Sequence, residues 1–260
     1  MTFKEFDVYN RQFEQNGNQP IPPLNYIIVR LDGRGFSKLT KETCSFNRPF
    51  DERFSDLMVE TTEYLINNSG FNVAYAYTQS DEISILLDRD DTTFDRRPKK
   101  ILTTFASMAS VYFSMNLDKQ LQIEDVYATF DATLDIRSDI DGVCDYFVWR
   151  QEDSARNCLN SYAYWTLRDR DKMSARKAGS TIESKDNDFK KELLSNYEID
   201  YDRVPDWQKY GTALYKVETN KTGVNPITGE KTTVKRKVIK TDYDLPLKDD
   251  YRNYIKAIID

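Results

Sequence analysis

The chain contains no histidine among its 260 residues. Histidine supplies the general base of Ser-His-Asp and Cys-His triads and is a common zinc ligand, so both kinds of histidine-dependent site are excluded. The chemistry that remains relies on carboxylates, lysines, arginines and tyrosines. Carboxylates favour hard cations such as Mg²⁺, which enzymes commonly bind together with phosphate groups.

Cysteine is scarce as well. The three cysteines, Cys44, Cys144 and Cys158, are odd in number and widely spaced, and they form no C-x-x-C pair. A structural zinc site or a disulfide framework is therefore not expected. We interpret these residues as buried or inert thiols.

Long apolar runs are also lacking. No stretch approaches the roughly 20 apolar residues that span a bilayer, and the charged start from Met1 to Asp7 has no apolar signal region. Charged residues make up 31% of the chain, while 17 Tyr and 14 Phe supply mass for a packed core. These features predict a cytoplasmic protein that does not associate with membranes.

The net charge of -6 argues weakly against non-specific binding of nucleic acid, but basic residues cluster locally. One cluster runs from Arg96 to Lys100, and another, from Lys231 to Lys240, holds five basic residues and no acidic one. A solvated surface explains either cluster. A helix dipole repels cations at its N-terminus, so the first cluster makes better sense if phosphate approaches that end. Arg96 and Arg97 are better candidates than the lysines because guanidinium binds phosphate in a bidentate manner.

Hydrophobic patterning predicts an α+β fold. The first part of the chain is expected to form two helices and four strands, in the order β-α-β-β-α-β of a ferredoxin-like core. The expected elements are a strand over 25–31, a helix from 49 to about 67, strands over 71–78 and 83–87, a helix over 99–117 and a strand over 126–135.

The second part of the chain is expected to add helices and a β-hairpin to this core. We predict helix over most of 141–169, shorter helices within 175–197, a hairpin formed by 211–219 and 232–239, and a final helix over 247–260. This gives a catalytic core over residues 1–170 and a C-terminal addition over 171–260.

Acidic residues lie at the ends of two predicted strands. Asp32 directly follows the first strand, and Asp81 and Glu82 lie in the turn between the second and third. Strands one and three are usually neighbours in this topology, so Asp32 and Asp81 should lie close enough to share two Mg²⁺ ions. Such ions activate an attacking hydroxyl and stabilise a leaving phosphate oxygen. Taken singly, Asp-Gly and Ser-Asp-Glu are also ordinary turn sequences, and that interpretation stays open.

Five motifs, in order from residue 30 to about 160, resemble those of the tRNA-His guanylyltransferase family and its relatives, the 3′–5′ RNA polymerases. They are Arg30 to Phe36, Ala76 to Glu82, the set Phe94, Arg96, Arg97 and Lys100, the pair Phe130-Asp131, and Trp149 to Asp153. A weaker match follows at Tyr210-Gly211-Thr212.

The resemblance implies a polymerase palm-like core with two Mg²⁺ ions held by Asp32, Asp81 and the Gly33 carbonyl, and a catalytic role for Glu82. It also implies that ATP activates a 5′-monophosphate of tRNA, after which the 3′-hydroxyl of GTP or another triphosphate attacks. A homo-tetramer is implied too. The nucleotide site would comprise Asp32, Gly33, Arg34, Gly35, Phe36, Ser37, Ser80 and Asp81, and phosphate or RNA would contact Arg96, Arg97, Lys100, Arg150 and Asn157.

One segment departs from the eukaryotic family pattern. Eukaryotic guanylyltransferases carry His-Ile-Asn-Asn-Leu-Tyr-Asn where this chain has Ala155 to Ser161. The difference resembles bacterial and archaeal relatives and predicts template-dependent repair of tRNA 5′ ends, with guanylylation of tRNA-His as a second activity.

Two other function classes stay open. A palm-type nucleotide cyclase would use the same two aspartates but has no need of the segment Trp149 to Gln151. An inactive RNA-binding module would have no reason to keep Asp32, Asp81 and Glu82 together.

Overall fold

The computed structural model describes residues 4–5, 8, 17–44, 46–123, 125–224 and 231–259. In the first half, the elements are β1 (Tyr26–Arg34), α2 (Phe36–Lys38), a π-helical turn (Leu39–Thr43), α3 (Glu52–Asn68), β2 (Val73–Gln79), β3 (Glu82–Leu87), a 3-10 turn (Thr93–Arg96), α4 (Pro98–Leu121) and β4 (Thr129–Arg137). The second half forms α5 (Ile140–Asp169), α6 (Ala175–Ile182), α7 (Asn187–Ser195), a 3-10 turn (Tyr201–Arg203), α8 (Asp206–Tyr210), β5 (Thr212–Val224), β6 (Lys231–Asp242) and α9 (Lys248–Ile259).

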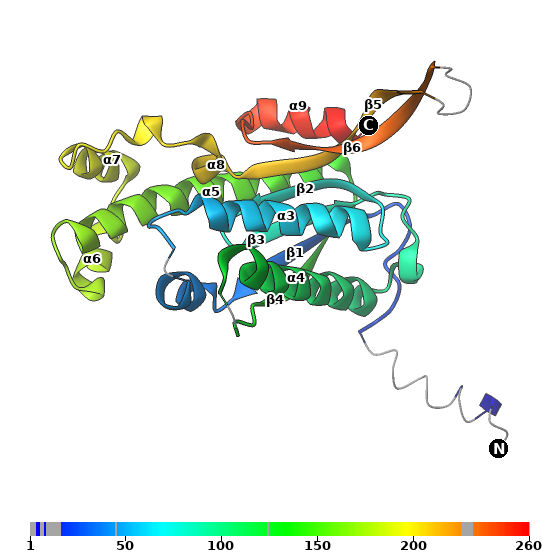
Figure 1. The fold of residues 1–260 in the computed structure, drawn as a ribbon, viewed down its shortest axis with the longest axis horizontal. Coiled ribbons are helices and arrows are strands. Elements are labelled where there is room, and N and C mark those ends of the chain that lie inside the picture. The colour runs from blue at the N-terminus through cyan, green and yellow to red at the C-terminus, as the bar shows by residue number, and fades with distance from the viewer. Residues whose placement is uncertain are drawn as a thin grey trace.

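A six-stranded sheet in the order β4-β1-β3-β2-β5-β6 forms the centre of the protein, and the five neighbouring pairs are antiparallel. Helices α3 and α4 cover one face and α5 and α9 the other (Figure 1). Alternate residues of a strand point to opposite faces. In β1, Ile27 and Val29 accordingly pack with α3 and α4, whereas Tyr26 and Ile28 pack with α5 and α9.

The predicted α+β class and the β-α-β-β-α-β order are confirmed. The helix predicted from residue 49 begins later than expected, because Asp51 rather than Pro49 marks its start. The Asp51 carboxylate accepts hydrogen bonds from the backbone N–H of Arg53, at 2.9 Å, and of Asn47, at 2.7 Å. It therefore caps α3, which begins at Glu52.

The predicted C-terminal hairpin is also confirmed, and it is longer than expected. β5 pairs with β2 of the core, for example Ala76 with Leu214, so the hairpin extends the core sheet. The turn between β5 and β6 lies outside the described residues. The division of the chain at residue 170 stays a prediction.

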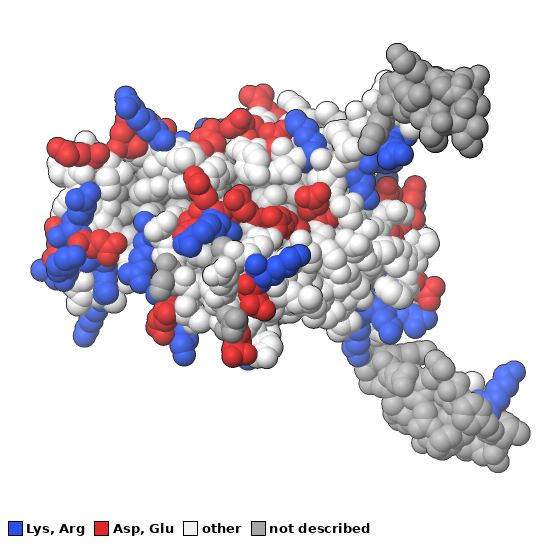
Figure 2. All heavy atoms as spheres, viewed as in Figure 1, with Lys and Arg blue, Asp and Glu red and all other residues white. Residues whose placement is uncertain are grey.

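No helix within the described ranges is both long and apolar enough to cross a membrane. On the face that α3 and α4 cover, acidic and basic side chains are interspersed, and neither sign dominates (Figure 2).

Candidate active site

The fold brings Asp32 and Asp81 to one small hollow. Asp32 on β1 lies directly opposite Glu82 on β3, and Asp81 lies in the two-residue turn that joins β2 to β3. The Gly33 N–H donates a hydrogen bond of 3.0 Å to the Asp81 carbonyl, which fixes this turn against the end of β1. The hollow is lined by Arg30, Asp32, Gln79, Ser80, Asp81, Glu82, Arg150, Asp153 and Asn157.

The ionised forms of both aspartates are electrostatically unfavourable, so their pKa values are raised. Partial burial raises the pKa of Asp32, and the charge of Asp131, directly opposite on β4, raises it further. Burial and then the charge of Asp32 raise the pKa of Asp81. Neighbouring carboxylates of this kind are stabilised by a bound cation.

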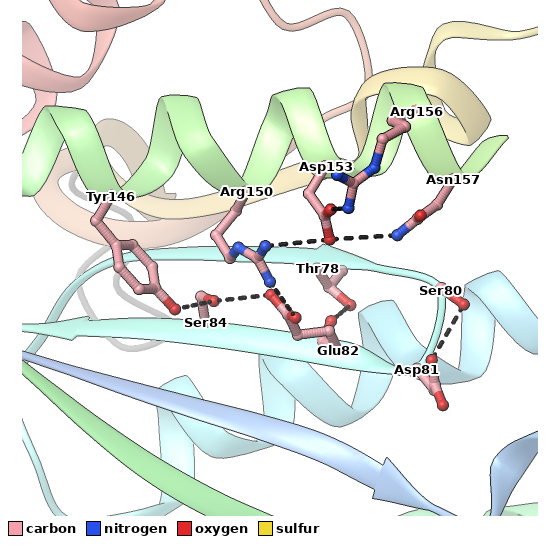
Figure 3. A network of polar contacts seen from close by, with 10 residues as sticks. All are labelled: Thr78, Ser80, Asp81, Glu82, Ser84, Tyr146, Arg150, Asp153, Arg156 and Asn157. Atoms are coloured by element: carbon pink, nitrogen blue, oxygen red, sulfur yellow. Dashed lines mark hydrogen bonds and ion pairs between the residues drawn. The ribbon is translucent and has the colours of Figure 1, made fainter. Parts of the chain in front are cut away.

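Glu82 is buried and bound to α5 (Figure 3). Its Oε2 accepts a hydrogen bond of 2.9 Å from Arg150 Nη1, and its side chain is only 8% exposed. Burial raises the pKa of Glu82, although the Arg150 charge opposes that shift. Glu82 therefore already has an ion-pair partner, Arg150, within the protein.

Arg150 is held on several sides. Its Nη2 lies 3.1 Å from Asp153 Oδ2, and its Cζ lies 3.7 Å from the centre of the Trp149 ring. Asp153 also forms an ion pair with Arg156 and accepts a hydrogen bond of 3.2 Å from Asn157 Nδ2. Arg150, a predicted phosphate or RNA contact, is thus buried and occupied by two carboxylates, whereas Asn157 is exposed at the rim.

The predicted nucleotide loop from Gly33 to Ser37 is built around a core aromatic residue. The Phe36 ring is buried, with its centre 4.9 Å from that of Phe130. A Cβ on Gly33 would lie 2.4 Å from the Phe36 ring, and Gly35 has a φ of 74°. Both positions therefore require glycine, and Phe36 can contact a ligand only through its backbone. Arg34 and Ser37 are exposed.

Arg96 does not face solvent as the basic cluster suggested. Its guanidinium donates to the carbonyls of Ile21, Asn25, Arg89 and Asp91 over 2.6–3.2 Å. Four of its five N–H groups are thereby used, and the residue is 6% exposed. We correct the expected phosphate role of Arg96 on this basis, because its side chain fastens the segment before β1.

Arg97 and Lys100 are exposed, but they lie away from the hollow. The bond from Arg96 to Asn25 places the start of α4 beside the start of β1 (Figure 1). Asp32 lies seven residues after Asn25, about 23 Å farther at roughly 3.3 Å per residue. A phosphate held at Asp32 is therefore beyond the reach of these two side chains in the same chain.

Sequence reasoning missed several residues of the hollow. Arg30, Gln79 and Asp153 line it, and Asp131 lies beside it. Strand alternation could have found Arg30, which lies two residues before Asp32 on the same face. A second cleft meets the hollow at Gln79, Ser80 and Asn157, and its wall includes Trp165, stacked beneath the Arg48 guanidinium at 4.1 Å.

Two family models match the sequence. The tRNAHis guanylyltransferase family model matches residues 7–136, and the Thg1 C terminal domain model matches residues 141–253. A tRNA(His) guanylyltransferase of Debaryomyces hansenii is 35% identical over 214 residues, covering 80% of this chain and 79% of that protein. A probable tRNA(His) guanylyltransferase of Drosophila melanogaster is 30% identical, covering 80% and 72%.

Solved structures of the same family share the fold. The crystal structure of the Saccharomyces cerevisiae tRNA(His) guanylyltransferase superposes with a TM-score of 0.72 at 27% identity, covering 80% of this chain and 91% of that one. A bacterial guanylyltransferase-like protein in complex with ATP gives a TM-score of 0.75 at 24% identity, covering 98% and 99%. The chain belongs to the tRNA(His) guanylyltransferase family of nucleotidyltransferases.

Proposed function

We propose that this protein adds nucleotides to the 5′ end of tRNA in the 3′–5′ direction, chiefly to repair truncated ends by copying the opposite strand. The observation that carries the proposal is the convergence of Asp32 and Asp81 on one hollow beside the glycine-containing loop. Family membership supplies the reaction class.

The donor set of the hollow suits Mg²⁺. Asp32, Asp81 and the Gly33 carbonyl would hold the ions, because they are oxygen donors and the two carboxylates repel each other. When bound, two Mg²⁺ ions would favour ionisation of the attacking 3′-hydroxyl and stabilise the leaving group, which is AMP from an adenylylated 5′ end or pyrophosphate from a 5′-triphosphate. No cluster of three or more Asp, Glu, Cys or His side chains suited to a metal occurs in the described part of the chain, so this proposal relies on the aspartate pair.

The protein's own groups would bind and orient the nucleotide. Phe36 anchors the Gly33–Ser37 loop in the core, so the N–H groups of Gly35, Phe36 and Ser37 would face the triphosphate with little freedom to move. The adjoining cleft, with Trp165 and Phe50 in its wall, would accept the base.

Template dependence is motivated by the altered segment on α5. Asn157, Cys158 and Ser161 of that segment line the second cleft, together with the small side chain of Ser154. A templated nucleotide gains pairing and stacking from the RNA itself, so the protein need supply little base recognition. We therefore expect the four bases to be accepted when they are templated.

The test compares two substrates, intact tRNA-His and a tRNA that lacks its first nucleotide, each with the four triphosphates in turn. We expect the higher kcat/KM for the templated nucleotide on truncated tRNA. A higher value for intact tRNA-His with GTP would overturn the repair proposal and leave guanylylation. A cyclic product from triphosphate alone would favour a cyclase, and tRNA binding without any transfer would favour an RNA-binding module.

A further inference from the structure

We propose that Arg30 is the residue of the active-site hollow that binds phosphate, either the 5′-phosphate of the RNA or the triphosphate of the nucleotide. The inference rests on the proposed function, because it assumes that both substrates bring phosphate to Asp32 and Asp81. It assigns to Arg30 a task that the sequence had suggested for four other cations.

Each of those four cations is occupied or remote. Arg96 donates to four carbonyls, and Arg150 is buried between Glu82 and Asp153. Arg97 and Lys100 lie beside the start of β1, and Asp32 lies near its end. Among the described residues that line the hollow, the cations are Arg30 and Arg150, so Arg30 is the one left to meet phosphate.

Arg30 is free to take this role. It lies on the wall of the hollow and is half-buried. Its nearest cross-strand neighbours, Ser84 on β3 and Thr133 on β4, are uncharged. Within the described residues Arg30 has no hydrogen bond and no ion pair, although the charges of Asp32 and Glu82 attract it.

The position of Arg30 also fits a phosphate group. Residues i and i+2 of a strand share a face and lie about 7 Å apart, so the Arg30 and Asp32 side chains point to the same side of β1. A long arginine side chain covers that distance and can present two parallel N–H groups to phosphate oxygens. Arg150 neutralises Glu82, which leaves the Arg30 guanidinium available for an incoming anion.

The principal alternative is that Arg30 serves only as a counter-ion for Asp32 and Glu82. The two roles differ in what the loss of Arg30 does to substrate binding. A counter-ion holds no substrate, so its loss would leave affinity for phosphate groups unchanged or tighten the binding of Mg²⁺. A side chain that binds phosphate contributes a charge-assisted contact. Its loss should lower the affinity for one phosphate-bearing substrate by about 10- to 150-fold.

The experiment measures two affinities of the full-length protein in Mg²⁺. Fluorescence anisotropy compares a truncated tRNA carrying a 5′-monophosphate with the same tRNA carrying a 5′-hydroxyl, without triphosphate, so that no turnover occurs. A separate titration measures binding of a non-hydrolysable triphosphate. The variants are Arg30→Ala and Arg30→Lys, which keeps the charge but loses the bidentate geometry.

Arg137→Ala is the matched control. Arg137 lies on the same face of the sheet at the far end of β4, where its Nη2 donates to Asp135 Oδ2 at 2.9 Å. We expect this variant to bind both substrates like the wild type. The melting temperature of Arg30→Ala should also stay near the wild-type value, because the side chain has no hydrogen-bond or ion-pair partner within the described residues.

Loss of the preference for the 5′-monophosphate in Arg30→Ala would assign Arg30 to the RNA end. If Arg30→Ala binds the triphosphate more weakly but keeps the preference for the 5′-monophosphate, Arg30 binds the nucleotide. If both affinities equal those of the wild type, Arg30 is not a phosphate ligand. These readouts need no catalysis, so a wild-type protein that transfers no nucleotide would overturn the proposed function separately.

Discussion

Replacing Arg150 with Met should destabilise the protein more than any other single change in the hollow. The Arg150 and Glu82 side chains are only 6% and 8% exposed, and Arg150 also pairs with Asp153. Removing one partner of a buried ion pair leaves uncompensated charge and costs about 3–5 kcal/mol of the free energy of unfolding. At roughly 2–4 °C per kcal/mol, the melting temperature should fall by about 6–20 °C.

Two companion variants make this reasoning testable by urea denaturation. Glu82→Gln should cost less, about 1–3 kcal/mol, because Arg150 keeps Asp153 and the new amide can still accept a hydrogen bond. Arg156→Ala is the control, since Arg156 pairs with the same Asp153 but is 67% exposed and should cost under about 1 kcal/mol. A loss below about 1 kcal/mol in Arg150→Met, or a larger loss in Glu82→Gln, would refute the argument.

Three further outcomes follow from the same structure. Asp32→Asn and Asp81→Asn should each abolish nucleotide transfer while the melting temperature holds or rises, because burial and charge repulsion raise both pKa values and disfavour the charged forms; wild-type turnover in either variant would contradict the metal assignment. Gly33→Ala should lose about 1–3 kcal/mol in chemical denaturation, since its Cβ would meet the Phe36 ring, and unchanged stability would show that the loop can move. Burial would raise the pKa of Asp51, but hydrogen bonds from Arg53 and Asn47 outweigh it and lower the pKa, so its stabilisation should be present above about pH 4 and lost on further acidification; Asp51→Asn should flatten that part of the acid-unfolding profile.

The sequence was sufficient to predict the core and the meeting of two distant acids. Asp32 and Asp81 are 49 positions apart, yet the neighbours of their strands follow from the β-α-β-β-α-β order. The first strand is longer than predicted, so Asp32 lies two residues before the end of β1 rather than after it. Hydrophobic alternation specifies such an order, because each strand must bury its apolar face against helices. That topology makes β1 and β3 neighbours, and their register places Asp32 opposite Glu82.

The basic cluster shows where sequence reasoning failed. Arg96 lies in a run of cations, but Phe94, Asp95 and Arg96 all have positive φ values, between 52° and 54°. This left-handed stretch turns the Arg96 side chain inward to four carbonyls, and such backbone conformations carry no signal in composition. The position of the cluster beside the start of β1, away from Asp32, could not be predicted from the sequence either. It depends on the direction in which α4 crosses the sheet.

The two arginines of the hollow show why a motif alone does not define a role. Arg150 belongs to a segment that resembles a motif of the family, and the sequence suggested that it binds phosphate. Its position on α5 instead places it above Glu82, where leaving the carboxylate unpaired would be costly. Arg30 stands in an equally familiar motif but has uncharged neighbours across both adjacent strands. Which guanidinium stays free is therefore decided by packing between a helix and a sheet, and a substitution at Arg30 should change substrate binding where one at Arg150 first changes stability.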